Sequence, residues 1–413
     1  MKGKVFLGVD AGCQEHEVFA MDEAGCQLWQ ERIVNDQSGC DRVLERMQAW
    51  KEEGYEVWVG AEGYGGYLSP LDVRIAAAGF PFVGFHPKQV KAFRSVDQVQ
   101  PDKDDRLDAK LVALLLKWSN AKGELAATPE RDEYLRALRE AARAFETATR
   151  HKVTLQNRLV SKVREYWPEL VVTDRVFEST DALGLLHFLT KYPTPQQAAR
   201  AGISKVAAAM RTGGKAQRRD KAERIVEQAR GLRDKLEVSD AVALVVQGMT
   251  EELIRAIESV RAWEKAMAKI LKDHFFGAWL LEQTGISVRT AGCFLGEAGN
   301  LDRFPTEAKL ARFAGNGAVR VQSGSSRPKH YDAHRYNHRL KRAIILMANY
   351  RAQYDPASRD YLEHRKRLGD THWQAVKKLA RHLLGFLWKA WQHLVNGETI
   401  PPLQAPKISA PGG

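Results

Sequence analysis

Four acidic residues in the first quarter of the chain have the types and settings that phosphate chemistry needs. They are Asp10 in VFLGVDAG, Glu62 in VWVGAEGYGGY, and Asp105 with Asp108 in DKDDRLDAKLVALLL. Each lies at the edge of a hydrophobic run, where a carboxylate is costly unless something compensates it. Brought together, the four would repel each other, and a pair of divalent cations would remove that repulsion and supply Lewis acidity. Because the ligands are hard oxygens, Mg²⁺ is the natural cation.

Each acid also has an ordinary interpretation. Asp10 could be a turn residue and Glu62 a solvated loop acid. Asp105 and Asp108 could belong to the first turn of a helix, where the dipole favours negative charge. Taken together, in this order and in these settings, the four residues favour a metal site.

The segments around these acids predict a mixed sheet covered by helices. Apolar runs at 5–9, 17–21 and 27–34 predict three strands, the last two joined as a hairpin at Gly25. A helix capped by Ser38 follows at about 38–51, and strands and helices then alternate at 56–61, 68–78, 80–85 and 104–118. Active sites in such sheets lie at strand ends, where Asp10 and Glu62 occur. Gly63, Gly65 and Gly66 would let a nucleic-acid backbone approach, or form a flexible loop.

The composition indicates a large protein with a polyanionic partner. A chain of 413 residues predicts two or three domains, and its net charge of +12 favours nucleic acid over the weaker alternative of an anionic membrane surface. The four cysteines have no zinc spacing and predict reduced thiols in a cytoplasm. No stretch resembles a signal peptide or approaches the ~20 apolar residues of a membrane span, so we expect a soluble intracellular protein.

The middle of the chain, 126–275, predicts a helical coiled-coil region. Apolar residues recur at heptad spacing from Ile225 to Leu271, and an earlier helix is expected from Glu133 to about Tyr166. The two could form an intramolecular hairpin, a dimer seam, or both. Between them, TPQQAARAGISKVAAAMR resembles a helix-turn-helix with Gly202 at its turn. Phosphate contacts or a solvated charge run are equally expected for Lys215, Arg218 and Arg219.

The C-terminal region, 276–398, combines a helical hairpin with a basic segment. The stretch LLEQTGISVRTAGCFLGEAG predicts helix, turn at Gly285 and helix, a shape that presents backbone N–H groups to phosphate. A hydroxyl next to a glycine among arginines is a candidate nucleophile, and Ser323, Ser325 and Ser326 compete for that role, although a solvated loop serine is the commoner case. Candidate nucleic-acid contacts here are Arg320, Arg327, Lys329, Arg335, Arg339, Lys341 and Arg342.

Two further expectations concern histidines and tryptophans. His330, His334 and His338 step by four and could share one helix face, for phosphate contact or plain surface rather than for zinc. Aromatic residues of the C-terminal helices, Trp373, Phe386, Trp388 and Trp391, should pack the domain. The Pro-rich tail, 399–413, should be disordered.

These motifs resemble the DEDD transposases of bacterial insertion sequences. GVDAG, AEGYGGY and DDRLDAKLVA resemble the D, E and D-x-x-D-A signature of that family, whose N-terminal domain is similar to Holliday-junction resolvases of the ribonuclease H fold. The family's last motif usually reads K-T-D-x-x-D-A. Here Asp104 stands in the place of Thr, so Asp105 and Asp108 are the matching pair, and Asp102 or Asp104 could assist. TGIS, LDRF, AGNG and QSG are similar to the family's C-terminal motifs, and the S-G match corresponds to Ser323.

The resemblance implies a fold, a reaction and partners. The N-terminal domain, 1–125, would be a ribonuclease H-like α/β domain in which Asp10, Glu62, Asp105 and Asp108 hold Mg²⁺. Ser323 would attack a DNA phosphate and form a covalent intermediate. The family also implies a noncoding bridge RNA that guides the choice of DNA, a homo-oligomer (dimer or tetramer), and a nucleoid-associated bacterial enzyme. The basic charge is merely compatible with an RNA guide.

Two other functions remain open from the residues themselves. The carboxylates could form a metal-dependent junction nuclease that uses water as its nucleophile. Alternatively, the chain could be a non-catalytic nucleic-acid scaffold in which its helices and basic patches matter and the carboxylates do not.

Overall fold

The chain folds into two compact units, residues 1–130 and 131–413. The computed structural model describes residues 2–62, 68–97, 105–125, 127, 132–173, 182–211, 219–233, 238–321, 329–332 and 336–400. A finer division of the second unit, at 275 and 398, stays a prediction, and the expected disordered tail lies almost entirely outside the described residues.

The N-terminal unit is built on one mixed five-stranded sheet, as predicted, with the order β3-β2-β1-β4-β5. Antiparallel pairing joins β1 to β2 and β2 to β3, whereas β4 is parallel to both β1 and β5. The strands are β1 (Gly3–Ala11), β2 (Glu15–Asp22), β3 (Gln27–Val34), β4 (Tyr55–Glu62) and β5 (Phe82–Phe85). Such a sheet agrees with the ribonuclease H-like α/β fold that the resemblance implies.

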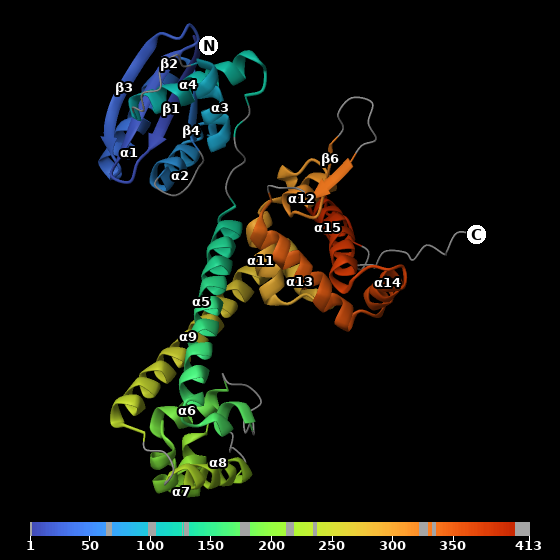
Figure 1. The fold of residues 1–413 in the computed structure, drawn as a ribbon. Coiled ribbons are helices and arrows are strands. Elements are labelled where there is room, and N and C mark those ends of the chain that lie inside the picture. Colours follow the sequence, from blue (N-terminus) through green and yellow to red (C-terminus); the bar gives the residue numbers. More distant parts are fainter. Residues whose placement is uncertain are drawn as a thin grey trace, which may run out of the picture. The chain divides into compact units, whose positions relative to one another are not determined.

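Helices cover both faces of this sheet (Figure 1). The helices are α1 (Gln37–Glu52), α2 (Ser69–Ala77), α3 (Pro87–Asp97) and α4 (Asp105–Ala121). Side chains of a strand alternate between its two faces. Leu7 and Val9 of β1 therefore share a core with α1 and α2, while Phe6 shares the opposite core with α3 and α4.

The start of α1 differs from the expectation. Its N-cap is Asp36 and not Ser38, and the Asp36 side chain accepts a hydrogen bond from the Gly39 N–H at 2.8 Å. Aspartate and serine are equally good N-caps, and Asp36 is the one whose backbone is extended. Ser38 consequently lies inside the first turn.

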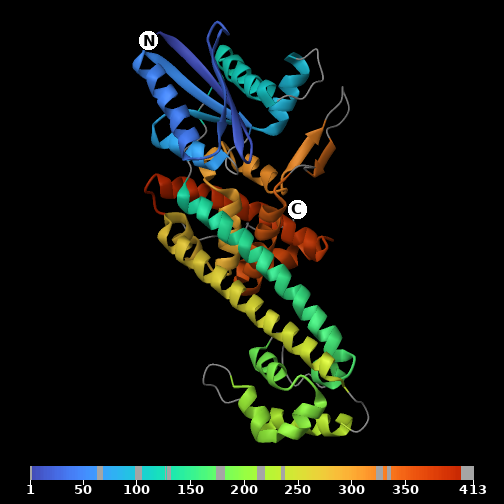
Figure 2. The same cartoon turned by 90° about the vertical axis from the view of Figure 1, so that its left-hand side faces the viewer.

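Two long helices form the spine of the second unit. Figure 2 shows α5 (Glu133–Arg164) and α9 (Asp240–Asp273) side by side, as an antiparallel pair within one chain. Leu138 near the start of α5 shares a core with Met267 near the end of α9, while Leu159 shares a core with Val246 at the opposite ends. This is the intramolecular hairpin that the heptads allowed, and association between chains stays a prediction.

The expected single helix from Ile225 to Leu271 is wrong. The structure has two helices there, α8 (Arg219–Arg233) and α9, and α9 begins after Ser239, whose side chain accepts a hydrogen bond from the Val242 N–H at 3.4 Å. The heptad pattern continues in the sequence between α8 and α9, but the Ser239 cap begins a new helix there. Within α9 the heptad positions are Ala243, Val246, Thr250, Leu253, Ile257, Val260, Glu264, Met267 and Leu271, and all of them except Glu264 are buried.

The remaining helices of the second unit are η2 (Glu169–Thr173), α6 (Leu183–Lys191), α7 (Pro195–Ala209), α10 (Phe275–Glu282), α11 (Val288–Ala298), η3 (Leu301–Arg303), α12 (Glu307–Phe313), α13 (His338–Tyr354), α14 (Pro356–Arg367) and α15 (His372–Val395). Helices η2, α6, α10 and α11 pack directly on the pair of α5 and α9, and the others pack on one another or on these. The predicted turn at Gly202 is confirmed as a non-helical kink with φ 74° inside α7.

Packing of the C-terminal aromatic residues follows the prediction with one exception. Trp391 is buried, and Phe386 and Trp388 are partly buried against the same core. Trp373, in contrast, is 60% exposed, because it lies in the first turn of α15, away from that core. All four cysteines are free, and no described helix has the length and apolarity to cross a membrane.

Candidate active site

Helix α4 lies across β1 and runs in the opposite direction. The Lys4 Nζ near the start of β1 donates to Asn120 Oδ1 near the end of α4 at 2.9 Å. Further along β1, a Cβ built on Gly8 would lie 2.1 Å from the Ala109 carbonyl oxygen and 2.6 Å from the Ala113 nitrogen. Glycine at this position is what lets the two backbones touch. The beginning of α4, with Asp105 and Asp108, therefore lies over the end of β1 that carries Asp10.

Asp10 and Glu62 both belong to the face of the sheet that α4 covers. Asp10 lies two residues after Gly8 on β1, so the two positions share one face of the sheet. A Cβ built on Gly8 would point at α4, which identifies that face as the one that α4 covers. Glu62 is paired with Phe85, which packs in the core under α4. The last register pair between the two strands is Val9 with Ala61, so Asp10 and Glu62 follow at the next position of two adjacent parallel strands.

Asp108 is positioned by α4 and engaged by an arginine. Its side chain is 17% exposed and forms an ion pair with Arg94 of α3. The backbone of Asp105 begins α4, but its side chain lies outside the described residues, as do Asp102 and Asp104. The structure thus brings Asp10, Glu62 and the start of α4 to one edge of the sheet.

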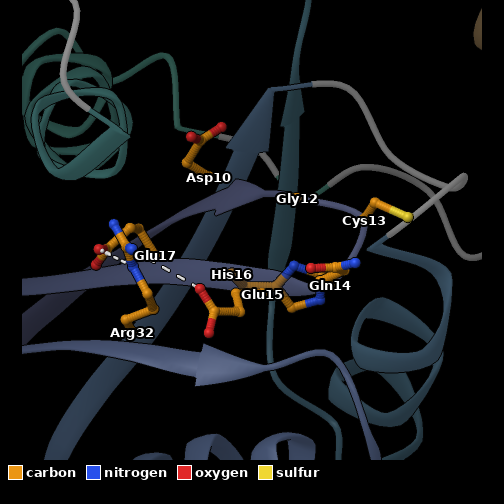
Figure 3. Close-up of a pocket in the computed structure, with 8 residues that line it drawn as sticks. All are labelled: Asp10, Gly12, Cys13, Gln14, Glu15, His16, Glu17 and Arg32. Atoms are coloured by element: carbon orange, nitrogen blue, oxygen red, sulfur yellow. Dashed lines mark hydrogen bonds and ion pairs between the residues drawn. The ribbon is translucent and has the colours of Figure 1, made fainter.

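Glu17 is a further carboxylate at this edge that the sequence analysis did not single out. It lies directly opposite Asp10 in the antiparallel pair of β1 and β2, and is 5% exposed. Two carboxylates directly opposite each other repel. Arg32, its partner on β3, compensates: the Arg32 Nε lies 2.8 Å from Glu17 Oε1 and Nη1 lies 3.7 Å from Glu15 Oε2 (Figure 3).

A cavity of about 330 Å³ opens beside this row of side chains. Its lining residues are Asp10, Gly12, Cys13, Gln14, Glu15, His16, Glu17 and Arg32. His16 is fully buried, and burial lowers its pKa, although the Asn35 side chain opposes that effect. The end of β1 therefore borders a hollow lined mainly by polar side chains.

The chemistry of these donors fits a divalent metal ion. Carboxylate oxygens are the ligands that Mg²⁺ prefers. Among the described residues, however, no three His, Cys, Asp or Glu side chains are gathered closely enough to hold a metal ion as they stand. Asp108 is held by Arg94, Glu17 is held by Arg32, and the Asp105 side chain is not described.

The candidate nucleophile and several candidate phosphate contacts lie outside the described residues. These are Ser323, Ser325, Ser326, Arg327, Arg335, Lys215 and Arg218. The segment that contains Ser323 connects β6 (Ala318–Val321) to β7 (Lys329–Asp332), which pair as an antiparallel hairpin. Arg320 belongs to β6 and Lys329 to β7, so these two basic residues lie on the paired strands of the hairpin.

Other basic candidates have partners within the protein. Arg339 Nε and Arg342 Nη1 lie 2.8 Å and 3.4 Å from the Glu146 carboxylate of α5, and the Lys341 Nζ lies 4.3 Å from the centre of the Tyr336 ring. Arg219 pairs with Glu223 on the same helix at 3.1 Å. Their roles in nucleic-acid binding stay predictions.

The expected histidine face is wrong. His330 lies in the strand β7, whereas His338 is the first residue of α13, so the two do not share a helix. The Asn337 side chain accepts from the Leu340 N–H at 3.0 Å and thereby starts α13 after His334, which is not described. The step of four is an accident of spacing.

A buried carboxylate fixes the chain within the basic segment, at Asn337. Glu297 of α11 is 4% exposed, accepts from Arg143 Nε at 2.7 Å and from Asn337 Nδ2 at 2.8 Å. Burial alone would raise the pKa of Glu297, but the hydrogen bonds from Arg143 and Asn337 outweigh it and the pKa is lowered. Asn337 is thereby tied both to its own helix and to α11.

The predicted helical hairpin is confirmed as α10, a turn and α11, but its turn is largely occupied by the protein. Gly285 has φ 78°, and a Cβ there would lie 2.5 Å from Arg351 Cα of α13. The N–H groups of Ile286 and Ser287 donate to Gln283 and Thr290. These donors are not available to a phosphate.

Comparison with known proteins covers both ends of the chain. Residues 7–168 match a model of the DEDD domain of IS110-type elements, described as a transposase, and residues 278–363 match one described as Transposase IS116/IS110/IS902 family. The chain is 25% identical over 397 residues to the IS110 uncharacterized 43.6 kDa protein of Streptomyces coelicolor, covering 93% of each. It is 25% identical over 392 residues to the IS116 uncharacterized 44.8 kDa protein of Streptomyces clavuligerus, covering 93% of this chain and 94% of that protein.

The chain is also 25% identical over 390 residues to the IS900 uncharacterized 42 kDa protein of Mycobacterium paratuberculosis, covering 94% of this chain and 96% of that protein. A mixed α/β domain with acidic residues at its strand ends, followed by a helical unit matched as a second transposase domain, defines a DNA transposase. The chain belongs to the IS116/IS110/IS902 family, the transposases of IS110-type insertion elements. Membership of this family implies that the protein cuts and rejoins DNA.

Proposed function

We propose that the protein recombines DNA through Mg²⁺-assisted attack of Ser323 on a phosphodiester. The observation that carries the metal half of this proposal is the antiparallel docking of α4 on β1. This docking supports the proposal because it brings the start of α4, which carries Asp105 and Asp108, toward the strand ends that carry Asp10 and Glu62. These four residues would hold the metal, and Mg²⁺ bound there would supply Lewis acidity to the phosphate.

In the serine part of the proposed reaction, the number of phosphate ester bonds stays the same at each step. The Ser323 oxygen forms a bond to phosphorus, the bond between phosphorus and a deoxyribose oxygen breaks, and the freed hydroxyl takes up a proton in exchange for the one that serine loses. Attack by a hydroxyl of a second strand then reverses these steps and releases the serine. No external energy source is needed, because each step exchanges one phosphate ester for another.

The partners we propose are the two ends of the element, a target DNA and a noncoding guide RNA from the same element. The net charge of +12 supports polyanionic partners but does not distinguish DNA from RNA. We also propose that the active species is a homo-oligomer, a dimer or a tetramer, and that it works on nucleoid DNA.

A second candidate function is a junction nuclease that uses the carboxylates and water alone. It is favoured by one observation: Asp10, Glu62, Asp105 and Asp108 all belong to the first compact unit, whereas Ser323 belongs to the second. Hydrolysis at the first unit would not need the serine.

One assay separates the two functions. The protein is incubated with element-end DNA, Mg²⁺ and the transcript that flanks its gene, and protein–DNA adducts are separated on a denaturing gel. An adduct that disappears in Ser323→Ala supports recombination through serine. Cleavage that persists in Ser323→Ala supports the nuclease, and binding without cleavage or adduct in the wild type would exclude both.

A further inference from the structure

Arg94 of α3 is paired with Asp108, one of the carboxylates that the proposed function assigns to the metal. Its guanidinium forms an ion pair with Asp108, with Nη2 against Oδ1. We propose that Arg94 is an exchangeable counter-ion of the metal centre. It holds Asp108 in the metal-free protein, yields Asp108 to a divalent cation, and then binds a phosphate of the DNA. This inference rests on the proposed metal site.

Packing of α3 against α4 delivers Arg94 to this place. Val90 of α3 is 2% exposed in the core beneath α4, and the ring centres of Phe93 and Trp118 lie 5.9 Å apart. Arg94 follows Phe93 directly in the last turn of α3. The packing of α3 on α4 therefore determines where the backbone of Arg94 lies relative to Asp108.

The ion pair gives Asp108 a cation from within the protein. The described residues contain no ready-made group of three metal-binding side chains, and Asp108 is committed to Arg94. A monovalent guanidinium neutralises one carboxylate, whereas a divalent cation attracts several hard oxygens at once. With a divalent cation present, Asp108 gains more by joining the other carboxylates than by keeping Arg94.

Arg94 has unused capacity for a second acceptor. Its Nε is buried and has no hydrogen-bond partner among the described residues, while the side chain as a whole remains 31% exposed. The guanidinium fork matches a phosphate as well as a carboxylate. A phosphate that shares a metal ion with Asp108 must lie within a few ångströms of that carboxylate, and therefore within reach of Arg94.

The first test is Mn²⁺ binding to the full-length protein without DNA, measured by isothermal titration calorimetry. Arg94→Gln removes the competing cation, and Lys91→Gln removes the same charge from an exposed position one turn earlier on α3. We expect Arg94→Gln to bind Mn²⁺ about two- to fivefold more tightly than Lys91→Gln, the size expected from a partly exposed ion pair. Equal or weaker binding would overturn the proposal.

The second test is DNA affinity with and without Ca²⁺, measured by fluorescence anisotropy with a labelled element-end duplex. We expect Ca²⁺ to tighten DNA binding by the wild type and by Lys91→Gln, and to tighten it less in Arg94→Gln. An unchanged Ca²⁺ effect in Arg94→Gln would show that Arg94 does not pass to the phosphate. If Arg94→Gln fails to fold, Arg94→Lys, which keeps the charge but loses the fork, should give smaller shifts in the same directions.

Asp10→Asn distinguishes failure of this inference from failure of the metal site. If Asp10→Asn binds Mn²⁺ as tightly as the wild type, the metal centre itself is wrong, and Arg94 has no such role. If Asp10→Asn loses Mn²⁺ binding while Arg94→Gln behaves like Lys91→Gln, the metal centre stands and only the role of Arg94 falls.

Discussion

Gly8 of β1 and Ala109 of α4 touch backbone to backbone, with 2.1 Å between the Ala109 carbonyl oxygen and the place where a Cβ on Gly8 would lie. No side chain can be added there without moving α4. Because α4 carries Asp105 and Asp108, this contact limits how close β1 and the start of α4 can lie. Gly8 is thus a structural determinant of the candidate active site although it has no chemistry of its own.

Gly8→Ala should therefore lower both stability and strand transfer. Overpacking of this kind costs about 1–3 kcal/mol, and a shift of the site by about 1 Å costs on the order of a hundredfold in rate. Thermal unfolding and the adduct assay measure the two effects. Gly248→Ala is the matched control: its Cβ would meet nothing within 4 Å, and it lies inside α9, where alanine should stabilise slightly. A fully active, fully stable Gly8→Ala protein would contradict the docking described here.

Asp10→Asn should abolish strand transfer and leave nucleic-acid binding largely intact. The substitution keeps the size of the side chain and removes the charge that a divalent cation needs. Glu45→Gln, which removes an exposed charge on α1, serves as the control and should remain active. Activity of Asp10→Asn within a factor of about two of the wild type would count against the metal assignment, as would the same result for Asp105→Asn.

Several features of this fold were predictable because they depend on local periodicity. Apolar runs predicted the strands, and the positions of Asp10 and Glu62 just after two of these runs predicted that both acids lie at strand ends. The errors arose where a cap decides the outcome: Ser239 starts α9 and breaks the heptad, and Asn337 starts α13 and separates His330 from His338. Both caps are residue types that commonly begin helices, so this signal was present in the sequence.

Glu17 and Arg94 were missed for a different reason. Glu17 lies beside Asp10 only because β1 and β2 pair in one particular register, which the two strand patterns do not define by themselves. Pairing β1 with β2 as a short-looped hairpin would have placed the two acids opposite each other. Arg94 meets Asp108 through the packing of α3 on α4, and no local pattern encodes that contact.

The pair of Glu17 and Arg32 should matter for stability beside Asp10. Arg32→Gln leaves a buried carboxylate opposite Asp10 without its cation, and we expect a loss of about 1–2 kcal/mol, a modest value because Arg32 is itself half exposed. Glu17→Gln removes the repulsion between Glu17 and Asp10 as well as the ion pair with Arg32, so it should lower the free energy of unfolding by less. Urea unfolding of both single variants and the double variant gives the coupling energy, and a coupling near zero would show that the pair contributes nothing.

His274 should make the helical unit less stable in mild acid. Burial lowers its pKa below the ordinary value of 6.5, and the nearby Asp132 carboxylate, with Oδ2 3.5 Å from Nε2, only partly opposes this. Its Nδ1 also accepts the Gly277 N–H at 3.3 Å, which requires an unprotonated nitrogen. The unfolded chain therefore binds a proton more readily than the folded one, and stability falls as pH drops through 6.5 toward the lowered pKa.

His274→Asn tests this directly, because asparagine can still cap α10 through its side-chain oxygen but does not titrate. Calorimetric unfolding at pH 7.5 and 5.5 should show a smaller loss of melting temperature for the variant than for the wild type. The loss should not vanish, since burial also lowers the pKa of His382, which belongs to the same unit. An equal loss in both proteins would mean that His274 is protonated in the folded state, with Asp132 rather than burial controlling its charge.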